Sequence, residues 1–201
     1  MTAALSPSRW YSALATYKGF QPELGAVLAS VAHHFMTTHA DRIAVRLGGP
    51  PDLVSIVPSK RGVTFEEQSL RKALVLVATT RAALQQTLEH VPLESVPRRG
   101  YNPRAFKPVG ETVVGKRVLL VEDAWVTGAT AVSAAGSLVE AGAAEVLVLP
   151  IARVIDAGFW PVDHPYRIAM RELWVPSDRR LWPRDSDRVR GAGTHDPAES
   201  Q

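Results

Sequence analysis

Residues 117–130 read RVLLVEDAWVTGAT, and this stretch decides the fold. Val118–Val121 form a continuous apolar run typical of a buried strand, Glu122 and Asp123 end that run, and a turn rich in Thr and Gly follows. The apolar positions after the turn keep helical spacing and are Val132, Ala135, Leu138 and Val139. The stretch therefore predicts a buried strand, a polar turn and a helix.

The same alternation extends outward in both directions. A second β-branched run, LVSIV at 53–57, leads into a basic turn, PSKRGVT at 58–64. On the other side, Gly142 is placed to end the helix that follows the strand at 118–121. Further elements are expected as helices at 10–18, 22–45 and 66–90 and as a strand at 146–154. Continuously apolar strands that alternate with helices predict an α/β fold with a central, mostly parallel sheet covered on both faces.

Length and composition exclude several classes of protein. The chain has 201 residues, of which 46% are hydrophobic and 21% charged, so one globular domain is expected. No stretch approaches the roughly 18 apolar residues of a membrane span. The first residues show no secretory signal, which makes a cytoplasmic setting the default. Because the chain has no cysteine, disulfide scaffolds, Cys-ligated zinc and thiol nucleophiles are excluded.

One segment within the expected domain does not fit this alternation. Residues 97–110, PRRGYNPRAFKPVG, carry four basic side chains and no acid, and no regular element is expected there. A loop of that length in a compact domain is usually functional or disordered. The domain is expected to span 1–190, with a core at about 43–155 and a small hood from the N-terminal helices and about 155–185. Residues 191–201 are expected to be a disordered tail.

The turn at 126–130 has the chemistry of a phosphate site. Thr127 and Thr130 supply hydroxyls, Gly128 permits close backbone approach, and the positive end of the following helix dipole favours an anion. Glu122 and Asp123 would repel a phosphate unless they bind something else, such as hydroxyl groups or a divalent cation. A phosphorylated sugar supplies both kinds of group.

The order of apolar strand, paired acids and Thr-Gly-x-Thr resembles the PRPP-binding signature of type I phosphoribosyltransferases. ALATYKGFQPELGAVLA near the N-terminus, IVPSKRG at 56–62 and the segment 98–130 are similar to the ComF-like branch, without its N-terminal zinc ribbon. The similarity covers roughly residues 10–155. It implies a type I phosphoribosyltransferase-like core and an enzyme that transfers the ribosyl 5-phosphate of PRPP to a nitrogen acceptor, with Mg²⁺ and release of pyrophosphate.

The resemblance also implies roles for individual residues. The catalytic group would be Glu122, Asp123, Lys60 and Arg61, with the two acids on the ribose hydroxyls and only indirectly on Mg²⁺. The 5-phosphate loop would be Val126, Thr127, Gly128, Ala129 and Thr130, and the pyrophosphate loop Ser59, Lys60, Arg61 and Gly62. A mobile loop would carry Arg98, Arg99, Tyr101, Asn102 and Arg104, and the candidates for stacking on a base are Trp125, Phe159 and Trp160.

Alternatives remain open at this point. The acids could belong to a phosphate-receiver domain, and Lys60 and Arg61 could be a solvated turn. Phe159 and Trp160 could be packing residues of the core or hood. The run at 97–110 could be an exposed loop or a nucleic-acid contact. Val126 stands where purine-salvage members have Asp, which disfavours hypoxanthine or guanine as acceptor. The rival function is a non-catalytic PRPP or nucleotide-binding regulator or DNA-uptake accessory protein. The acceptor is not identified, and self-association is left open.

Overall fold

The computed structural model describes residues 2–6, 12, 14, 16–18, 23–60, 63–75, 84–92, 100–109 and 113–156, with backbone only at 2–6 and at 155 and 156. Its elements, in chain order, are β1 (Thr2–Ser6), α2 (Glu23–Thr38), α3 (Ala40–Leu47), β2 (Leu53–Ile56), α4 (Ser69–Leu74), β3 (Leu88–His90), η1 (Pro103–Ala105), β4 (Phe106–Pro108), β5 (Arg117–Trp125), α6 (Ala129–Glu140) and β6 (Glu145–Asp156).

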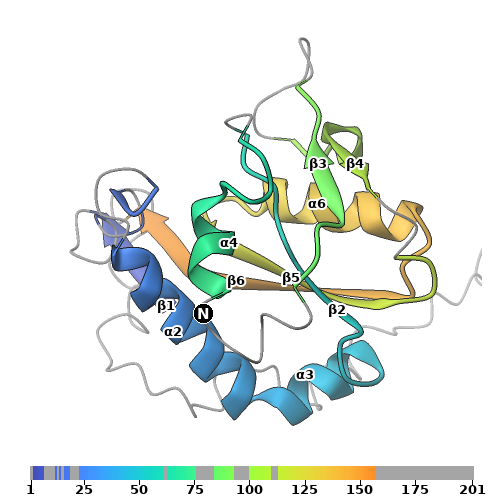
Figure 1. Ribbon diagram of the computed structural model, residues 1–201, viewed down its shortest axis with the longest axis horizontal. Helices are drawn as coiled ribbons and strands as arrows, with labels where there is room; N and C mark the ends of the chain where they lie inside the picture. Colours follow the sequence, from blue (N-terminus) through green and yellow to red (C-terminus); the bar gives the residue numbers. More distant parts are fainter. Residues whose placement is uncertain are drawn as a thin grey trace, which may run out of the picture.

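The centre of the molecule is a four-stranded sheet in the order β1-β6-β5-β2, in which every pair of neighbours is parallel. β2 and β5 are adjacent, with Leu53 beside Val118 and Ile56 beside Val121. The carboxyl ends of parallel strands meet at one edge, so the segments that follow β2 and β5 emerge together (Figure 1). The α/β class and the parallel sheet expected from the sequence are confirmed.

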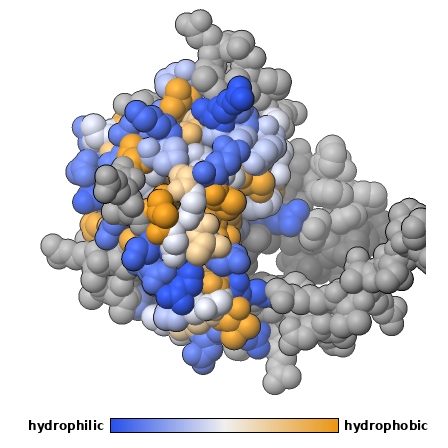
Figure 2. All heavy atoms as spheres, turned by 90° about the vertical axis from the view of Figure 1, so that its right-hand side faces the viewer, coloured by the Kyte–Doolittle hydropathy of each residue, from blue (hydrophilic) through white to orange (hydrophobic). Residues whose placement is uncertain are grey.

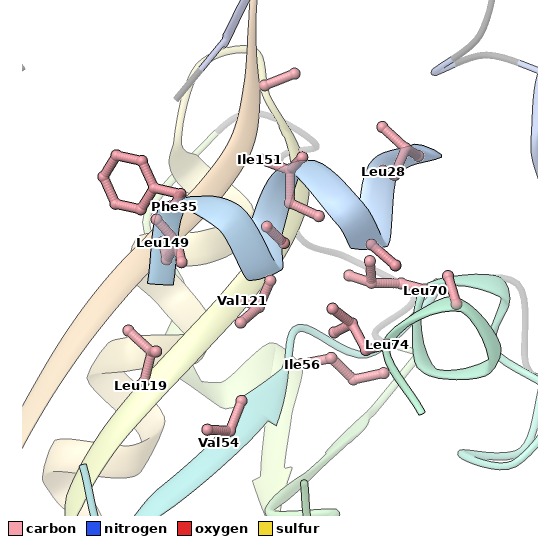
Figure 3. Packing of buried hydrophobic residues seen from close by; sticks show 14 of the residues in the cluster. Leu28, Phe35, Val54, Ile56, Leu70, Leu74, Leu119, Val121, Leu149 and Ile151 are labelled. Carbon is pink, nitrogen blue, oxygen red and sulfur yellow. The ribbon is translucent and has the colours of Figure 1, made fainter. Parts of the chain in front are cut away.

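Helices cover both faces of this sheet. Leu119 and Val121 of β5 pack with Leu28 and Phe35 of α2 on one face, where α4 also contributes, as Figure 3 shows. The alternate residues of β5 pack on the other face with Leu138 of α6 and with the small hairpin of β3 and β4. Because successive side chains of a strand point to opposite faces, a strand covered on both sides must be apolar throughout, as Val118–Val121 are.

The helix expected at 22–45 is divided in two. α2 ends at Thr38 and α3 begins at Ala40, with His39 between them at φ −116° and ψ 22°. The chain then leaves α3 through Gly48, whose φ of +69° is in the left-handed region that glycine adopts without strain. α2 contributes Leu28, Ala29, Ala32 and Phe35 to the main hydrophobic core.

The prediction of one long helix at 66–90 is wrong. Among the described residues of this segment only Ser69–Leu74 are helical, and from Leu84 the chain is extended beside β2. The backbone N–H of Gln85 donates to the carbonyl of Val54, and the buried hydroxyls of Thr87 and Ser55 lie 2.6 Å apart. These tertiary contacts favour an extended chain although the leucine spacing is helical.

Residues 100–109 also contain regular structure that the sequence did not predict. Pro103–Ala105 form a 3-10 turn, and Phe106–Pro108 form β4, which pairs with β3 in antiparallel register. β5 continues beyond the expected end at Val121 to Trp125, so the two acids lie within the strand. β1 was not predicted either. Residues 93–99, the hood expected at about 155–185 from residue 157 onward, and the tail expected at 191–201 lie outside the described residues.

An ion pair lies at the amino-terminal edge of the sheet. Figure 2 shows this side of the molecule, where apolar side chains form scattered patches among polar ones. Asp52 and Arg117 join β2 to β5 here, with the carboxylate accepting from Nε at 2.9 Å and from Nη2 at 2.8 Å. No helix in the described part of the chain is long and apolar enough to cross a membrane.

Candidate functional site

A cavity of about 390 Å³ lies at the carboxyl edge of β2 and β5. The segment after β2 contributes Pro58, Ser59 and Lys60, and β5 contributes Glu122 and Asp123. The remaining walls come from the start of α4, from Thr130 in the first turn of α6 and from two residues near the N-terminus, Tyr17 and Lys18. Residues distant in sequence therefore converge on one cavity, at the edge where open α/β sheets bind ligands.

A side-chain contact joins the two loops predicted to bind phosphate groups. Lys60 Nζ donates to Thr130 Oγ1 at 3.0 Å, although the two residues are 70 positions apart. Lys60 is exposed, so its ammonium group is accessible from the cavity. The contact places a positive charge beside the N-terminal turn of α6, where the helix dipole already favours an anion.

Glu122 lies at the inner wall of the cavity and is 8% exposed. Its Oε2 is buried and has no hydrogen-bond partner among the described residues. Burial, and to a smaller extent repulsion from Asp123, raises the pKa of Glu122 to about 8. The positive charges of Lys18 and Lys60 lower this pKa but do not cancel the rise. The carboxyl is therefore mostly protonated at pH 7 and offers one donor and several acceptor positions to a ligand hydroxyl.

Asp123 already has two partners. The Tyr17 hydroxyl donates to Asp123 Oδ2 at 2.7 Å, and Lys18 Nζ forms an ion pair with the same oxygen. Tyr17 is 1% exposed, whereas the Lys18 side chain is 37% exposed. Neither residue was among the predicted site residues. The only sequence signal was the similarity of the ALATYKGF segment to the ComF-like branch, which assigned these side chains no role.

The predicted 5-phosphate loop has a backbone that requires glycine. Gly128 has φ +81°, and a Cβ at this position would lie 2.1 Å from the indole of Trp125. The group that packs closely against Gly128 is therefore the indole of Trp125. The role of Trp125 as a base-stacking residue stays a prediction. Ala129 N–H donates to Thr127 Oγ1 at 3.4 Å, and of the five loop residues Thr130 lines the cavity.

The predicted pyrophosphate loop is held by a residue that sequence reasoning missed. Ser59 N–H donates to Oε1 of Gln68, which is 6% exposed and directly precedes α4. A buried glutamine before a short helix gave no recognisable signal in the sequence. Arg61 and Gly62 lie outside the described residues.

The predicted mobile loop is docked on α6 where the structure describes it. Asn102 N–H donates to Ser133 Oγ at 2.8 Å, and the Tyr101 ring lies against Gly136. Ser137 Oγ donates to the carbonyl of Phe106 at 3.0 Å. Tyr101, Asn102 and Arg104 are thus outside the cavity lining, and Arg98, Arg99, Phe159 and Trp160 lie outside the described residues.

This docking also changes the expected apolar face of α6. Ser133 and Ser137 are buried under residues 100–106, and Leu138 is buried in the core. Val132 and Val139, which were expected on the buried face, are 43% and 56% exposed. Small residues, rather than the valines, make room for the docked segment.

The described residues contain no group of three or more His, Asp or Glu side chains that could hold a metal ion. Three carboxyl groups in this part of the chain line the cavity: Glu122, whose pKa is raised, Asp123, which is paired, and Glu67, which accepts from Thr64. This donor set fits a cation that is bound mainly by oxygens of the ligand, with Glu122 and Asp123 in indirect contact.

Comparison with known proteins gives no relationship: the chain matches no protein-family model, and a search of curated protein sequences finds no match.

Proposed function

We propose that this protein is a phosphoribosyltransferase with a type I phosphoribosyltransferase-like core of the ComF-like branch, which binds PRPP and transfers its ribosyl 5-phosphate to a nitrogen acceptor. The observation that carries the proposal is the contact between Lys60 and Thr130 over the cavity that contains Glu122 and Asp123. It brings cationic, hydroxyl and carboxyl groups to one cavity from separate parts of the fold. PRPP is a ligand that needs all three kinds of partner.

Each part of PRPP has a matching part of the cavity. The 5-phosphate would bind at the N-terminal turn of α6, which contains Thr130. The 2- and 3-hydroxyls would bind Glu122 and Asp123, where the unpaired buried Oε2 would gain a partner. The pyrophosphate would lie beside Ser59 and Lys60, where the segment after β2 enters the cavity.

The reaction forms a bond between the acceptor nitrogen and the anomeric carbon and breaks the bond from that carbon to the pyrophosphate oxygen. The electron pair of the broken bond leaves with pyrophosphate, and the acceptor nitrogen gives up its proton to solvent. Positive charge develops on the ribose and negative charge on the leaving group. The protein mainly positions the reactants and neutralises charge, which Lys60 does on the pyrophosphate side.

Mg²⁺ would be held by pyrophosphate and ribose oxygens, with Glu122 and Asp123 as its indirect protein partners. When bound, it would supply positive charge that stabilises the departing pyrophosphate.

Binding of PRPP tests the site, and a double variant is the sharpest change. Replacing both acids (Glu122→Ala and Asp123→Ala) should abolish PRPP binding measured by calorimetry with Mg²⁺, while circular dichroism shows an intact fold. The matched control carries Glu140→Ala and Glu145→Ala, which remove two exposed carboxylates away from the cavity. PRPP affinity that is the same in both double variants would refute the assignment.

Catalysis is tested separately from binding. Pyrophosphate release should depend on PRPP, Mg²⁺ and one member of a panel of nucleobases, ammonia and small amines. Binding of PRPP without release for any acceptor would favour the rival function, a non-catalytic PRPP-binding regulator or DNA-uptake accessory protein.

A further inference from the structure

Lys18 and Asp123 form an ion pair in the cavity, and each side chain could also bind a phosphorylated sugar. The Asp123 carboxylate can accept hydrogen bonds from hydroxyl groups, and the Lys18 ammonium group can bind anions. Both partners of Asp123, the Tyr17 hydroxyl and the Lys18 ammonium, contact the same oxygen, Oδ2. The other carboxylate oxygen takes part in neither contact. The ion pair therefore satisfies, inside the protein, the same two groups that the ligand needs.

The two residues from the N-terminal segment differ in exposure. Tyr17 is 1% exposed, so its hydroxyl is a fixed donor that orients the Asp123 carboxylate. The Lys18 side chain is 37% exposed, and its Nζ lies 5.6 Å from the centre of the Tyr17 ring. A lysine has a flexible stem and an ammonium group with three donors, so Lys18 can change partner while Tyr17 stays in place.

The cavity shows which anion Lys18 can reach. Lys18 and Lys60 line the same cavity as Ser59 and the residues that begin α4. The 5-phosphate is proposed to lie at the N-terminal turn of α6, which lines the same cavity through Thr130 and is contacted by Lys60. The pyrophosphate is proposed to lie beside Ser59 and Lys60, and both Lys18 and Lys60 are close enough to Glu122 to lower its pKa, so the two cations can share one anionic group.

We infer that Lys18 exchanges partners when ligand binds: it leaves Asp123 as the ribose hydroxyls bind there and contacts the pyrophosphate group of the same ligand. This inference rests on the proposed function and adds a pyrophosphate-binding residue from the N-terminal segment. It also makes the two halves of the ligand cooperate, because the hydroxyls release the cation that the pyrophosphate requires.

The test is a double-mutant cycle with Lys18→Met and Asp123→Asn, each alone and both together, read by calorimetry with Mg²⁺ and three ligands. The ligands are pyrophosphate, PRPP and ribose 5-phosphate. Lys18→Met should weaken pyrophosphate and PRPP about tenfold, the size of one charge-assisted hydrogen bond, and should not weaken ribose 5-phosphate. Lys116→Met, at an exposed lysine outside the cavity, is the matched control and should change none of the three.

Asp123→Asn separates partner exchange from a simple change of local charge. It removes the negative charge that pairs with Lys18, so pyrophosphate should bind more tightly, whereas PRPP should bind more weakly because a neutral amide with one acceptor oxygen replaces the charged carboxylate as the partner of the ribose hydroxyls. In the double variant the gain for pyrophosphate should vanish, since it depends on the freed Lys18. Retained binding of ribose 5-phosphate by Lys18→Met shows that the fold is intact.

The outcomes distinguish this inference from the proposed function. If the unmodified protein binds PRPP but Lys18→Met leaves pyrophosphate affinity within about twofold, Lys18 is a bystander and only the exchange is overturned. An equal gain for pyrophosphate with and without Lys18 overturns it as well. If the unmodified protein binds none of the three ligands, both the proposed function and the exchange fail.

Discussion

The stability of Glu122→Gln relative to the unmodified protein should rise steadily between pH 5 and pH 8. Burial and the neighbouring Asp123 raise the pKa of Glu122 from 4.5 to about 8 in the folded protein. Below pH 4.5 the carboxyl is protonated in both the folded and the unfolded state, so it costs no stability. Between pH 4.5 and 8 it ionises only in the unfolded chain, which favours unfolding.

The magnitude follows from linkage. Each pH unit between the two pKa values costs about 1.4 kcal/mol, so raising the pKa from 4.5 to about 8 costs about 5 kcal/mol of folding free energy above pH 8. At pH 7 the cost is about 3 kcal/mol. Glutamine does not ionise and escapes this cost, although its buried amide adds a penalty of about 1–3 kcal/mol that does not change with pH. The slope with pH is therefore the informative quantity.

The assay is urea unfolding of the unmodified protein and Glu122→Gln at half-unit steps from pH 4.5 to 8.5. The difference in the free energy of unfolding should change by about 1.4 kcal/mol per pH unit in favour of glutamine and level off near pH 8. Glu140→Gln, at an exposed position in the last turn of α6, should show no such slope. A pH-independent difference for Glu122→Gln would refute the reasoning, because it would mean that the carboxyl titrates normally in the fold.

Two further predictions concern the sheet edges. Gly128→Ala should destabilise the fold by at least about 1–2 kcal/mol, because alanine is strained at φ +81° and its Cβ would meet the Trp125 indole. Adding Trp125→Ala should recover only the part of the loss that is due to the contact with the indole. Thermal unfolding of the single and the double variant measures both effects. Asp52→Asn should remove stability that the ion pair with Arg117 provides at neutral pH. The hydrogen bonds from Arg117 hold the pKa of Asp52 below its usual value, so this stability is present above about pH 4 and is lost as pH falls. The variant and the unmodified protein should therefore converge in acid unfolding experiments, and a gap that stays constant down to pH 2 would contradict this account.

The sequence was sufficient for the elements whose pattern reflects burial alone. The strands at 53–57 and 118–121 were predicted because strands covered on both faces must be apolar at every position, and Val118 and Leu120 face one core while Leu119 and Val121 face the other. The turn before α6 was also predicted, since a glycine at the N-terminus of a helix after a buried strand has few other uses.

The failures come from contacts made across long sequence separations. The leucine spacing at 66–90 is helical, but Leu84 and Gln85 bond to β2 and Thr87 is held by Ser55, which no local pattern reveals. Tyr17 was missed for the same reason, because its partner Asp123 is 106 positions away. Gln68 looked like an ordinary polar residue. Pairings between distant segments determined both the extent of α4 and one wall of the cavity.

The placement of β1 has a consequence for how the cavity assembles as the protein is made. Thr2 lies beside Ala152, so the first strand of the sheet has no partner until the last one has been synthesised. The nascent chain can bring β2, β5 and α6 together earlier, whereas Tyr17 and Lys18 belong to the segment between β1 and α2, and β1 pairs with β6. Contacts between such distant segments form slowly because a long loop must close. The carboxyl groups of the cavity are therefore expected to be assembled before the N-terminal segment that covers Asp123.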